Sequence, residues 1–143
     1  MSTTEHLCTF DVDTLFIGIQ INRIQEILRP QPVTPVPLTS SVILGLMSLR
    51  GQIVPIINLA ERLGVQLKEG GADAFNVLIR TADGPVSLLV DRVGDVVEVP
   101  SEAFEPAPDT LRSSLRPLIR GAYKLEKRLL LALNPEAAIQ VEY

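Results

Sequence analysis

The stretch Gly45–Gly64 reads Gly-Leu-Met-Ser-Leu-Arg-Gly-Gln-Ile-Val-Pro-Ile-Ile-Asn-Leu-Ala-Glu-Arg-Leu-Gly and carries the clearest local signals in the chain. Two apolar runs, Gly45–Leu49 and Gln52–Ile57, meet at Arg50-Gly51, which predicts two strands joined by a tight turn. Asn58 favours the start of a helix, and the final glycine favours its end. The stretch therefore predicts strand, turn, strand and short helix in succession.

Short β-branched runs bounded by Gly, Pro, Asp and Asn continue on both sides of this stretch and predict further strands. These lie at Leu7–Val12, Leu15–Ile21, Ile24–Arg29, Phe75–Thr81, Val86–Val90, Val93–Val99, Ile119–Lys124 and Leu129–Leu133. The proline-rich segment Pro30–Pro37 cannot be helical and is expected to be an extended connector. A closing helical turn is expected at Pro135–Ile139.

The chain also repeats itself, which bears on its architecture. Ile21–Leu28 aligns without gaps with Val90–Val97, in a shared pattern of apolar, polar, Arg, apolar, any, acidic, apolar and apolar residues. Arg50-Gly51 aligns with Arg120-Gly121 at almost the same offset along the chain, and an Asn followed by a helical stretch closes each half. The repeat predicts two similar β units of about five short strands, which are expected to curl into barrels because closure removes exposed edges.

Length and composition exclude several classes of protein. The 143 residues are one domain's worth of chain, and 46% hydrophobic with 21% charged residues excludes intrinsic disorder. The formal net charge of −4 argues against a nucleic-acid binder, which needs clustered cations to displace phosphate counterions. Two Tyr, four Phe and no Trp are too few for a base-stacking platform.

One Cys and one His cannot form a disulfide framework or a Cys/His zinc site, so we expect no metal and no cofactor. The residues 1–6 show no secretion signal, and every apolar run is far shorter than the ~20 residues of a membrane helix. We therefore expect a cytoplasmic protein without direct membrane insertion.

Two groups of residues are candidates for catalysis. His6 and Cys8 could form a thiol–imidazole pair, but a solvated histidine in a frayed tail beside a buried cysteine is the favoured interpretation. Asp91 and Asp95 could be paired carboxylates, but they more simply flank a bulge at Gly94 on a partly exposed strand. Catalysis is therefore not expected.

Glu26 and Arg50 stand out because each lies in apolar surroundings. Glu26 could be the polar side of an alternating strand, and Arg50 could be a turn residue that points into water beside Gly51 with positive φ. The functional alternative is an apolar protein-binding face, where one acid and one arginine fix the register and Ile24 supplies contact area.

The motif in Gly45–Gly64 resembles the signature of CheW-type chemotaxis coupling proteins, roughly Gly-x-x-x-x-Arg-Gly-x-Ile-x-Pro-apolar-x-Asp-Leu. The resemblance extends to Ile24–Ile27, to Val90–Val96 and to the late Gly121, and so covers essentially the whole chain. Asn58 stands where Asp is usual, and Met47-Ser48 replaces a more common Ile/Val-Asn pair. The turn and structural positions of the motif are Gly45, Gly51, Pro55, Asn58 and Gly121.

The resemblance implies a mainly β fold of two pseudo-duplicated five-stranded SH3-like β-barrels with a few short helices. As a single CheW-like domain over 1–143, the chain would place barrel 1 at about 15–82. Barrel 2 would occupy about 83–143 and include the N-terminal strand at about 7–13.

The implied function is that of a scaffold that binds the regulatory domain of the histidine kinase CheA and the cytoplasmic tip of chemoreceptors in membrane-associated arrays. By position, the receptor-binding residues would be Ile24, Glu26 and Arg50. Two alternatives remain: an adaptor of a chemotaxis-like pathway such as type IV pilus motility, and a small β-barrel thiol enzyme that uses Cys8.

Overall fold

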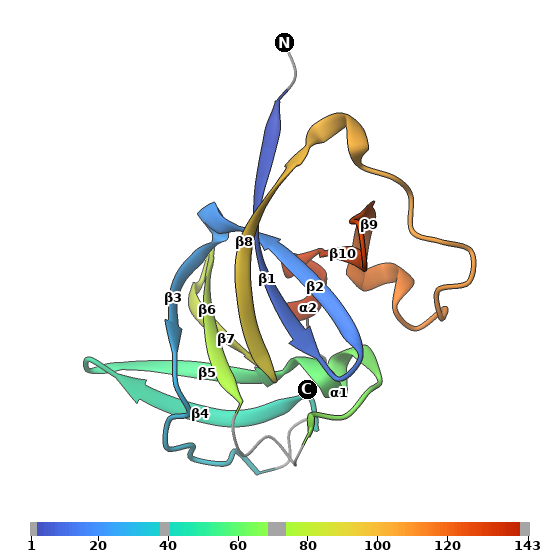
Figure 1. The fold of residues 1–143 in the computed structure, drawn as a ribbon. Helices are drawn as coiled ribbons and strands as arrows, with labels where there is room; N and C mark the ends of the chain where they lie inside the picture. Colours follow the sequence, from blue (N-terminus) through green and yellow to red (C-terminus); the bar gives the residue numbers. More distant parts are fainter. Residues whose placement is uncertain (1–2, 38–40, 69–73, 141–143) are drawn as a thin grey trace.

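The computed structural model describes residues 3–37, 41–68 and 74–140, and these residues form a mainly β structure (Figure 1). The strands are β1 (Thr4–Val12), β2 (Leu15–Gln20), β3 (Ile24–Leu28), β4 (Ile43–Leu49), β5 (Gln52–Asn58), β6 (Phe75–Thr81), β7 (Gly84–Val90), β8 (Arg92–Pro100), β9 (Ile119–Lys124) and β10 (Leu129–Leu133). The helices are α1 (Leu59–Leu63) and α2 (Pro135–Ile139), with 3-10 turns η1 (Ile21–Arg23), η3 (Ser101–Ala103) and η4 (Arg116–Leu118). Each predicted strand is present, with ends that differ by a few residues at most.

The strands form two five-stranded sheets with the same internal order in the described part of the chain. Sheet A has the order β8-β1-β2-β10-β9, and sheet B has the order β3-β6-β7-β5-β4. In sheet A, the strands β8, β9, β10, β1 and β2 take the places that β3, β4, β5, β6 and β7 take in sheet B. The N-terminal hairpin of β1 and β2 therefore supplies the last two strands of the second copy of the unit. The predicted pair of similar five-stranded β units is therefore confirmed.

The first alignment of the repeat, Ile21–Leu28 with Val90–Val97, agrees with the hydrogen-bond register. β3 shifts register against β6 between Ile24 and Glu26, and β8 shifts register against β1 between Val93 and Val96. The predicted bulge at Gly94 lies at this second shift, where the Thr9 hydroxyl donates to the Asp95 carbonyl at 2.6 Å. Both edge strands therefore bend at equivalent positions.

The second alignment, of Arg50-Gly51 with Arg120-Gly121, is wrong. Arg50-Gly51 form the β4–β5 turn, whereas Arg120-Gly121 lie inside β9. The residue equivalent to Gly121 is Gly45 in β4, because each of these glycines lies beside a bulge and an isolated bridge. The connection from β8 to β9 is longer than that from β3 to β4, which changes the offset, and a dipeptide match carries too little information to reveal that.

The asparagines that cap the two helices, Asn58 and Asn134, are as far apart along the chain as Gly45 and Gly121. Asn58 Oδ1 accepts the N–H of Glu61 at 3.2 Å, and Asn134 Oδ1 accepts the N–H of Ala137 at 3.2 Å. Gly64 ends α1 with φ of 78°. The predicted helix and its two ends are thus confirmed, and α2 begins with the same kind of asparagine cap as α1.

The hydrogen bonding divides the chain differently from the expected barrels at 15–82 and 83–143. β2 pairs with β1 and β10 in sheet A, and β7 pairs with β6 and β5 in sheet B. Two-residue turns hold β1 to β2 and β6 to β7, so neither hairpin is split between the sheets. The chain instead crosses between the sheets at η1 and at Asp91.

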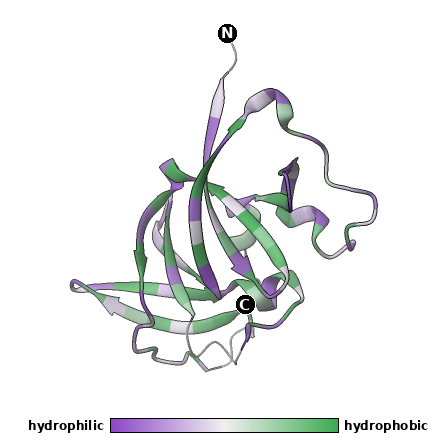
Figure 2. Ribbon diagram, in the orientation of Figure 1, coloured by the Kyte–Doolittle hydropathy of each residue, from purple (hydrophilic) through white to green (hydrophobic). Residues whose placement is uncertain are grey.

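Apolar burial between the two sheets holds the units together, and each sheet also buries a smaller cluster of its own. The largest buried cluster draws residues from both sheets, including Phe10 and Ile19 of sheet A and Val77 and Leu88 of sheet B. Two smaller clusters belong to one sheet each and contain the alternate residues of the same strands. Figure 2 shows hydrophobic residues along most strands, with hydrophilic residues between them.

Gly121→Ala is expected to lower the free energy of unfolding by about 1–3 kcal/mol. A Cβ at this position would lie 2.3 Å from Cζ of Phe104 and 2.5 Å from the carbonyl oxygen of Glu105. Chemical denaturation followed by circular dichroism measures the change. Lys127→Ala, at an exposed position of the β9–β10 turn, is the control and should stay within about 0.5 kcal/mol of the wild type. An unchanged Gly121→Ala would contradict the need for this close approach.

Candidate functional site

A bidentate ion pair joins Glu26 of β3 to Arg50 of the β4–β5 turn. Nη1 of Arg50 donates to Oε2 of Glu26 at 2.8 Å, and Nη2 donates to Oε1 at 2.5 Å. Two parallel bonds of this kind match the planar guanidinium to the planar carboxylate. Because β3 and β4 are the two edges of sheet B, the pair links one edge of the sheet to the turn that follows the other.

The backbone of the β4–β5 turn presents Arg50 to β3. Arg50 and Gly51 have φ values of 51° and 80°, and the flanking Leu49 and Gln52 pair with each other. Positive φ at both central residues is the geometry of tight hairpin turns whose twist matches the strands. The Arg50 side chain is 66% exposed while its end bonds Glu26, so it is both a turn residue in water and a partner of the acid.

Ile24 lies at the start of β3, two residues before Glu26. Its side chain is half-buried and packs against the cluster shared by the two sheets. Glu26 is also half-buried, while Gln25 and Ile27 between and beyond them are exposed. The three predicted site residues are therefore brought to one edge of sheet B, with Glu26 and Arg50 in direct contact.

The ion pair changes the acidity of Glu26. The hydrogen bonds from Arg50 lower the pKa of the Glu26 carboxyl below its ordinary value of 4.5; desolvation opposes this shift, and the charge of Arg50 adds to it. The same hydrogen bonds raise the pKa of Arg50. At neutral pH both groups are therefore charged, and the surface at this edge is a fixed dipole rather than a free cation.

The remaining motif positions have structural roles. Pro55 of β5 pairs with Leu46 of β4, and the parallel ladder of β5 with β7 begins one residue later, at Ile56, so the missing N–H of the proline breaks no bond of that ladder. A Cβ at Gly45 would lie 2.4 Å from the carbonyl oxygen of Thr34. These residues shape the sheet that carries the ion pair.

His6 and Cys8 do not form a catalytic pair. Cys8 is buried, and burial raises the pKa of its thiol, so the thiol stays protonated at neutral pH. His6 is exposed and its Nε2 lies 2.9 Å from Oε1 of Glu98. The expected frayed tail is wrong for His6, because β1 begins at Thr4 and pairs with β8 along that length.

Asp91 and Asp95 do not converge on a site either. Asp91 is buried at the crossing between β7 and β8, where Oδ2 accepts the N–H of Asp13 at 2.7 Å and Oδ1 accepts the N–H of Lys68 at 2.8 Å. Asp95 is exposed on β8. Asp91 therefore satisfies backbone donors from two segments and has a structural role.

Exposed apolar residues recur at equivalent positions of the two units, which the sequence pattern alone did not indicate. Ile27 and Val96, which the first alignment pairs, are 40% and 52% exposed. Ile53 and Leu129, each near the start of the second strand of its hairpin, are 62% and 36% exposed. The first pair could have been found from the repeat, whereas the second required the corrected register. The two units therefore expose apolar side chains at matched positions.

Each unit also carries a groove at its hairpin turn, beside β5 or β10. The groove of sheet B has a volume of about 280 Å³ and is lined in part by Gln52, Ile53, Pro55, Asp83 and Pro85. The groove of sheet A has a volume of about 420 Å³ and is lined in part by the equivalent Arg128, Leu129, Leu131, Thr14 and Phe16. In this groove the Cζ atom of Arg128 lies 4.1 Å from the centroid of the Phe16 ring, whereas the groove of sheet B is lined by Asp83. The two grooves therefore have equivalent lining positions but differ in volume and in charge.

The described residues offer neither a membrane-spanning helix nor a metal centre. No helix among them is long and apolar enough to cross a membrane. Within those same residues, no group of three or more His, Cys, Asp and Glu side chains is arranged to hold a metal ion.

Comparisons with known proteins show the family to which the fold belongs. The model of the CheW-like domain family matches residues 6–142. The chain belongs to the CheW-like domain family. It is 32% identical over 131 residues to a probable chemotaxis protein CheW of Rhizobium etli, and the match covers 92% of this chain and 84% of that protein.

Three further similarities extend the comparison. The chain is 28% identical over 136 residues to the chemotaxis protein CheW of Rhizobium meliloti, with 95% of this chain and 88% of that protein covered. A less similar relative is Protein PilI of Pseudomonas aeruginosa, 25% identical over 125 residues, with 87% of this chain and 70% of that protein covered. Among solved structures, the scaffolding protein TtCheW of Thermoanaerobacter tengcongensis matches with a TM-score of 0.82 at 22% identity, over 92% of this chain and 90% of that one, which confirms the fold.

Arg50→Gln is expected to raise the pKa of Glu26 toward its ordinary value, because the largest cause of its lowering is the hydrogen bonding of Arg50. Since the folded-state pKa is depressed, the pair stabilises the fold above pH 4.5 and its contribution disappears as the pH falls through the lowered value. An NMR titration of the Glu26 carboxyl carbon in both proteins measures the shift. Equal Glu26 titration curves in the wild type and in Arg50→Gln would show that the pair does not form in solution. Arg112→Gln, which changes an exposed arginine elsewhere, is the control.

Proposed function

We propose that this protein is a non-enzymatic adaptor that couples chemoreceptors to the histidine kinase CheA in bacterial chemotaxis. Its membership of the CheW-like domain family supports this proposal, as do the relatives named chemotaxis protein CheW. The similar solved structure is that of a protein described as a scaffold, which agrees with an adaptor role.

The observation that carries the proposal is that both units expose apolar side chains at matched positions. An adaptor must hold two partners at once and therefore needs two separate contact areas. Ile27 with Ile53 on one unit and Val96 with Leu129 on the other provide exposed apolar area at equivalent positions. Because the nearby charges differ between the copies, each unit can select a different partner.

The receptor-binding residues in this proposal are Ile24, Glu26 and Arg50. A chemoreceptor tip is a helical hairpin, and a helix binds through an apolar face with charged residues beside it. The exposed guanidinium of Arg50 and the apolar edge of β3 offer both kinds of contact. The kinase regulatory domain would then bind the apolar surface that the receptor leaves free.

Such an adaptor acts through geometry and mass action and makes or breaks no covalent bond. Each contact is weak alone, and an array of many receptors and kinases raises the overall affinity through multivalency. The receptor signal is a small shift in packing that changes the balance between active and inactive kinase. The protein works in the cytoplasm, where the arrays recruit it to the membrane.

Two alternatives have different support. The similarity to Protein PilI favours, as a second candidate, an adaptor of a chemotaxis-like pathway such as type IV pilus motility. The thiol enzyme finds no such support, because Cys8 is buried and the one histidine of the chain points to Glu98.

Calorimetric titration with the regulatory domain of a CheA kinase from the same organism tests the proposal. We expect binding in the micromolar range, equivalent to ~8 kcal/mol. A folded protein that binds neither this domain nor the tip of a chemoreceptor would overturn the assignment to chemotaxis. Binding to the kinase of a parallel pathway alone would establish the second candidate.

Arg50→Glu is expected to weaken binding to the receptor tip by about tenfold or more, because it replaces an interface arginine by a like charge next to Glu26. The fold should persist, since an exposed turn charge seldom costs more than ~0.5 kcal/mol. Lys127→Glu is the matched control, because it makes the same charge change in the corresponding turn of sheet A. Equal receptor binding by Arg50→Glu would show that this edge is not the receptor site.

A further inference from the structure

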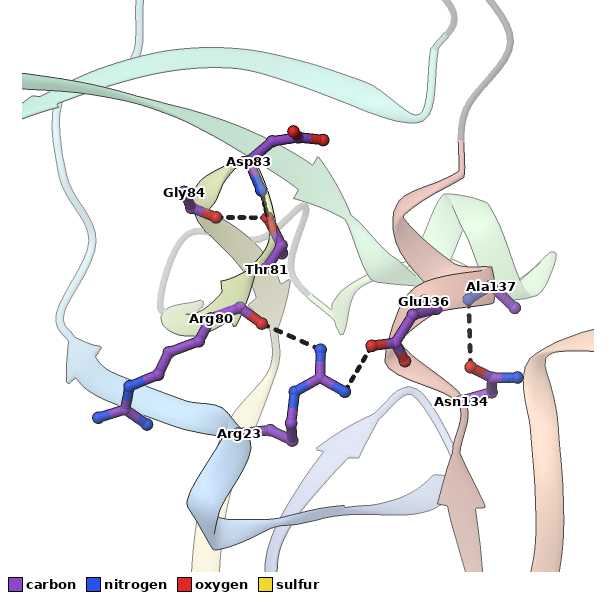
Figure 3. A network of polar contacts seen from close by, with 8 residues as sticks. All are labelled: Arg23, Arg80, Thr81, Asp83, Gly84, Asn134, Glu136 and Ala137. Carbon is purple, nitrogen blue, oxygen red and sulfur yellow. Dashed lines mark hydrogen bonds and ion pairs between the residues drawn. The ribbon is translucent and has the colours of Figure 1, made fainter.

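Arg23 lies where the chain passes from sheet A to sheet B and contacts both units. It is the last residue of η1, between β2 and β3. Its Nη1 lies 2.6 Å from Oε1 of Glu136 in the first turn of α2, and its Nη2 donates to the carbonyl oxygen of Arg80 in β6 at 3.0 Å. Figure 3 shows the guanidinium between these two acceptors. One side chain therefore links α2, β6 and the start of β3.

A second arginine fixes the same crossing from the opposite direction. Nη1 of Arg80 donates to the carbonyl oxygens of Asn22 and Ile24, at 2.9 Å in both cases. Each arginine thus bonds the backbone of the segment that carries the other. The position of Ile24, the first residue of the proposed receptor-binding strand, is set by this exchange.

The helix α2 receives another contact from the unit of sheet B. Nη2 of Arg62, on α1, donates to the carbonyl oxygen of Ala137 at 3.0 Å. Arg23 and Arg62 therefore hold α2 at two neighbouring residues, Glu136 and Ala137. Because α2 follows β10 of sheet A, both contacts join the two units.

The two crossings between the sheets differ in accessibility. At the second crossing, the buried carboxylate of Asp91 accepts two backbone N–H groups. At the first crossing, the Arg23–Glu136 pair is open to solvent on the side of Glu136, because the Arg23 side chain is 25% exposed and the Glu136 side chain 62% exposed. A surface ion pair contributes little to global stability and can open without unfolding. The contact between Arg23 and Glu136 is therefore the one that can open and close while the fold persists.

We propose that the Arg23–Glu136 ion pair is a positioning contact that couples α2 of one unit to the binding strand β3 of the other. The pair sets the orientation of Ile24 relative to sheet A. A partner that moves β3 then changes the position of α2, and a partner on the unit of sheet A changes β3. This role rests on the proposed function, because it gives the two binding surfaces a physical connection.

The first test uses the free protein and needs no partner. Glu136→Gln keeps the size of the side chain and removes the charge that Arg23 contacts. We expect the backbone amides of β3 and α2 to exchange about threefold faster with solvent, measured by hydrogen–deuterium exchange. Glu126→Gln is the matched control, because it removes an exposed acid from the β9–β10 turn of the same unit. Unchanged exchange in β3 overturns the inference, whatever the protein binds.

The second test measures coupling between partners. In the wild type, saturating CheA regulatory domain should change the Kd for a chemoreceptor tip by roughly fivefold or more. In Glu136→Gln the Kd for the receptor tip should be the same within about twofold with and without the CheA regulatory domain. The Kd of each partner alone should stay close to the wild-type value. Glu126→Gln should keep the wild-type coupling.

The outcomes separate the positioning role from the adaptor function. Wild-type protein that binds both partners, with coupling retained in Glu136→Gln, overturns the positioning role and leaves the proposed function standing. Glu136→Gln that fails to bind either partner alone also overturns it, because Glu136 would then be part of a contact surface or of the fold. Wild-type protein that binds neither partner overturns both proposals.

Discussion

The parallel pairing of β2 with β10 is the interaction on which the rest of the structure depends. It joins the N-terminal hairpin, which already pairs with β8, to the last two strands of the chain, with Ile17 opposite Leu131 and Gly18 opposite Ala132. Without it, sheet A would be two separate pieces, each with open edges and half a core. With it, both sheets reach the same order, and their shared apolar cluster is enclosed. The fold therefore requires contacts between the two ends of the chain.

The candidate site is a consequence of that architecture. The Glu26–Arg50 pair forms because β3 and the β4–β5 turn are the ends of a sheet that curls, which brings two distant positions of the sequence into contact. Exposed apolar residues recur at the same places on both units because the units are copies of one plan. The copies differ in charge around this plan, which lets one small protein present two distinct surfaces.

Much of the site could be predicted because its signals are local. A bounded apolar run favours a strand wherever it occurs, and Asn58 caps α1 through a bond to the nearby Glu61. The repeat predicts the correct register for β3 and β8 because the compared stretch, Ile21–Leu28, is long enough to be specific. The alignment of Arg50-Gly51 with Arg120-Gly121 is wrong because a match of two residues arises easily by chance. The connection between β8 and β9 is longer than that between β3 and β4, and the residue equivalent to Gly121 is therefore Gly45.

The sequence alone determined the strands, the capped helix, the duplication and the residues Glu26 and Arg50 as unusual charges in apolar surroundings. Their bidentate contact, the burial of Asp91 and the link from Arg23 to Glu136 were decided by the tertiary structure alone. The physical reason is the distance along the chain over which each interaction acts. Turn geometry, capping and alternation act within a few residues, whereas an ion pair across a sheet depends on the curvature of every strand between its partners. The chain thus encodes its elements locally and its site through their assembly.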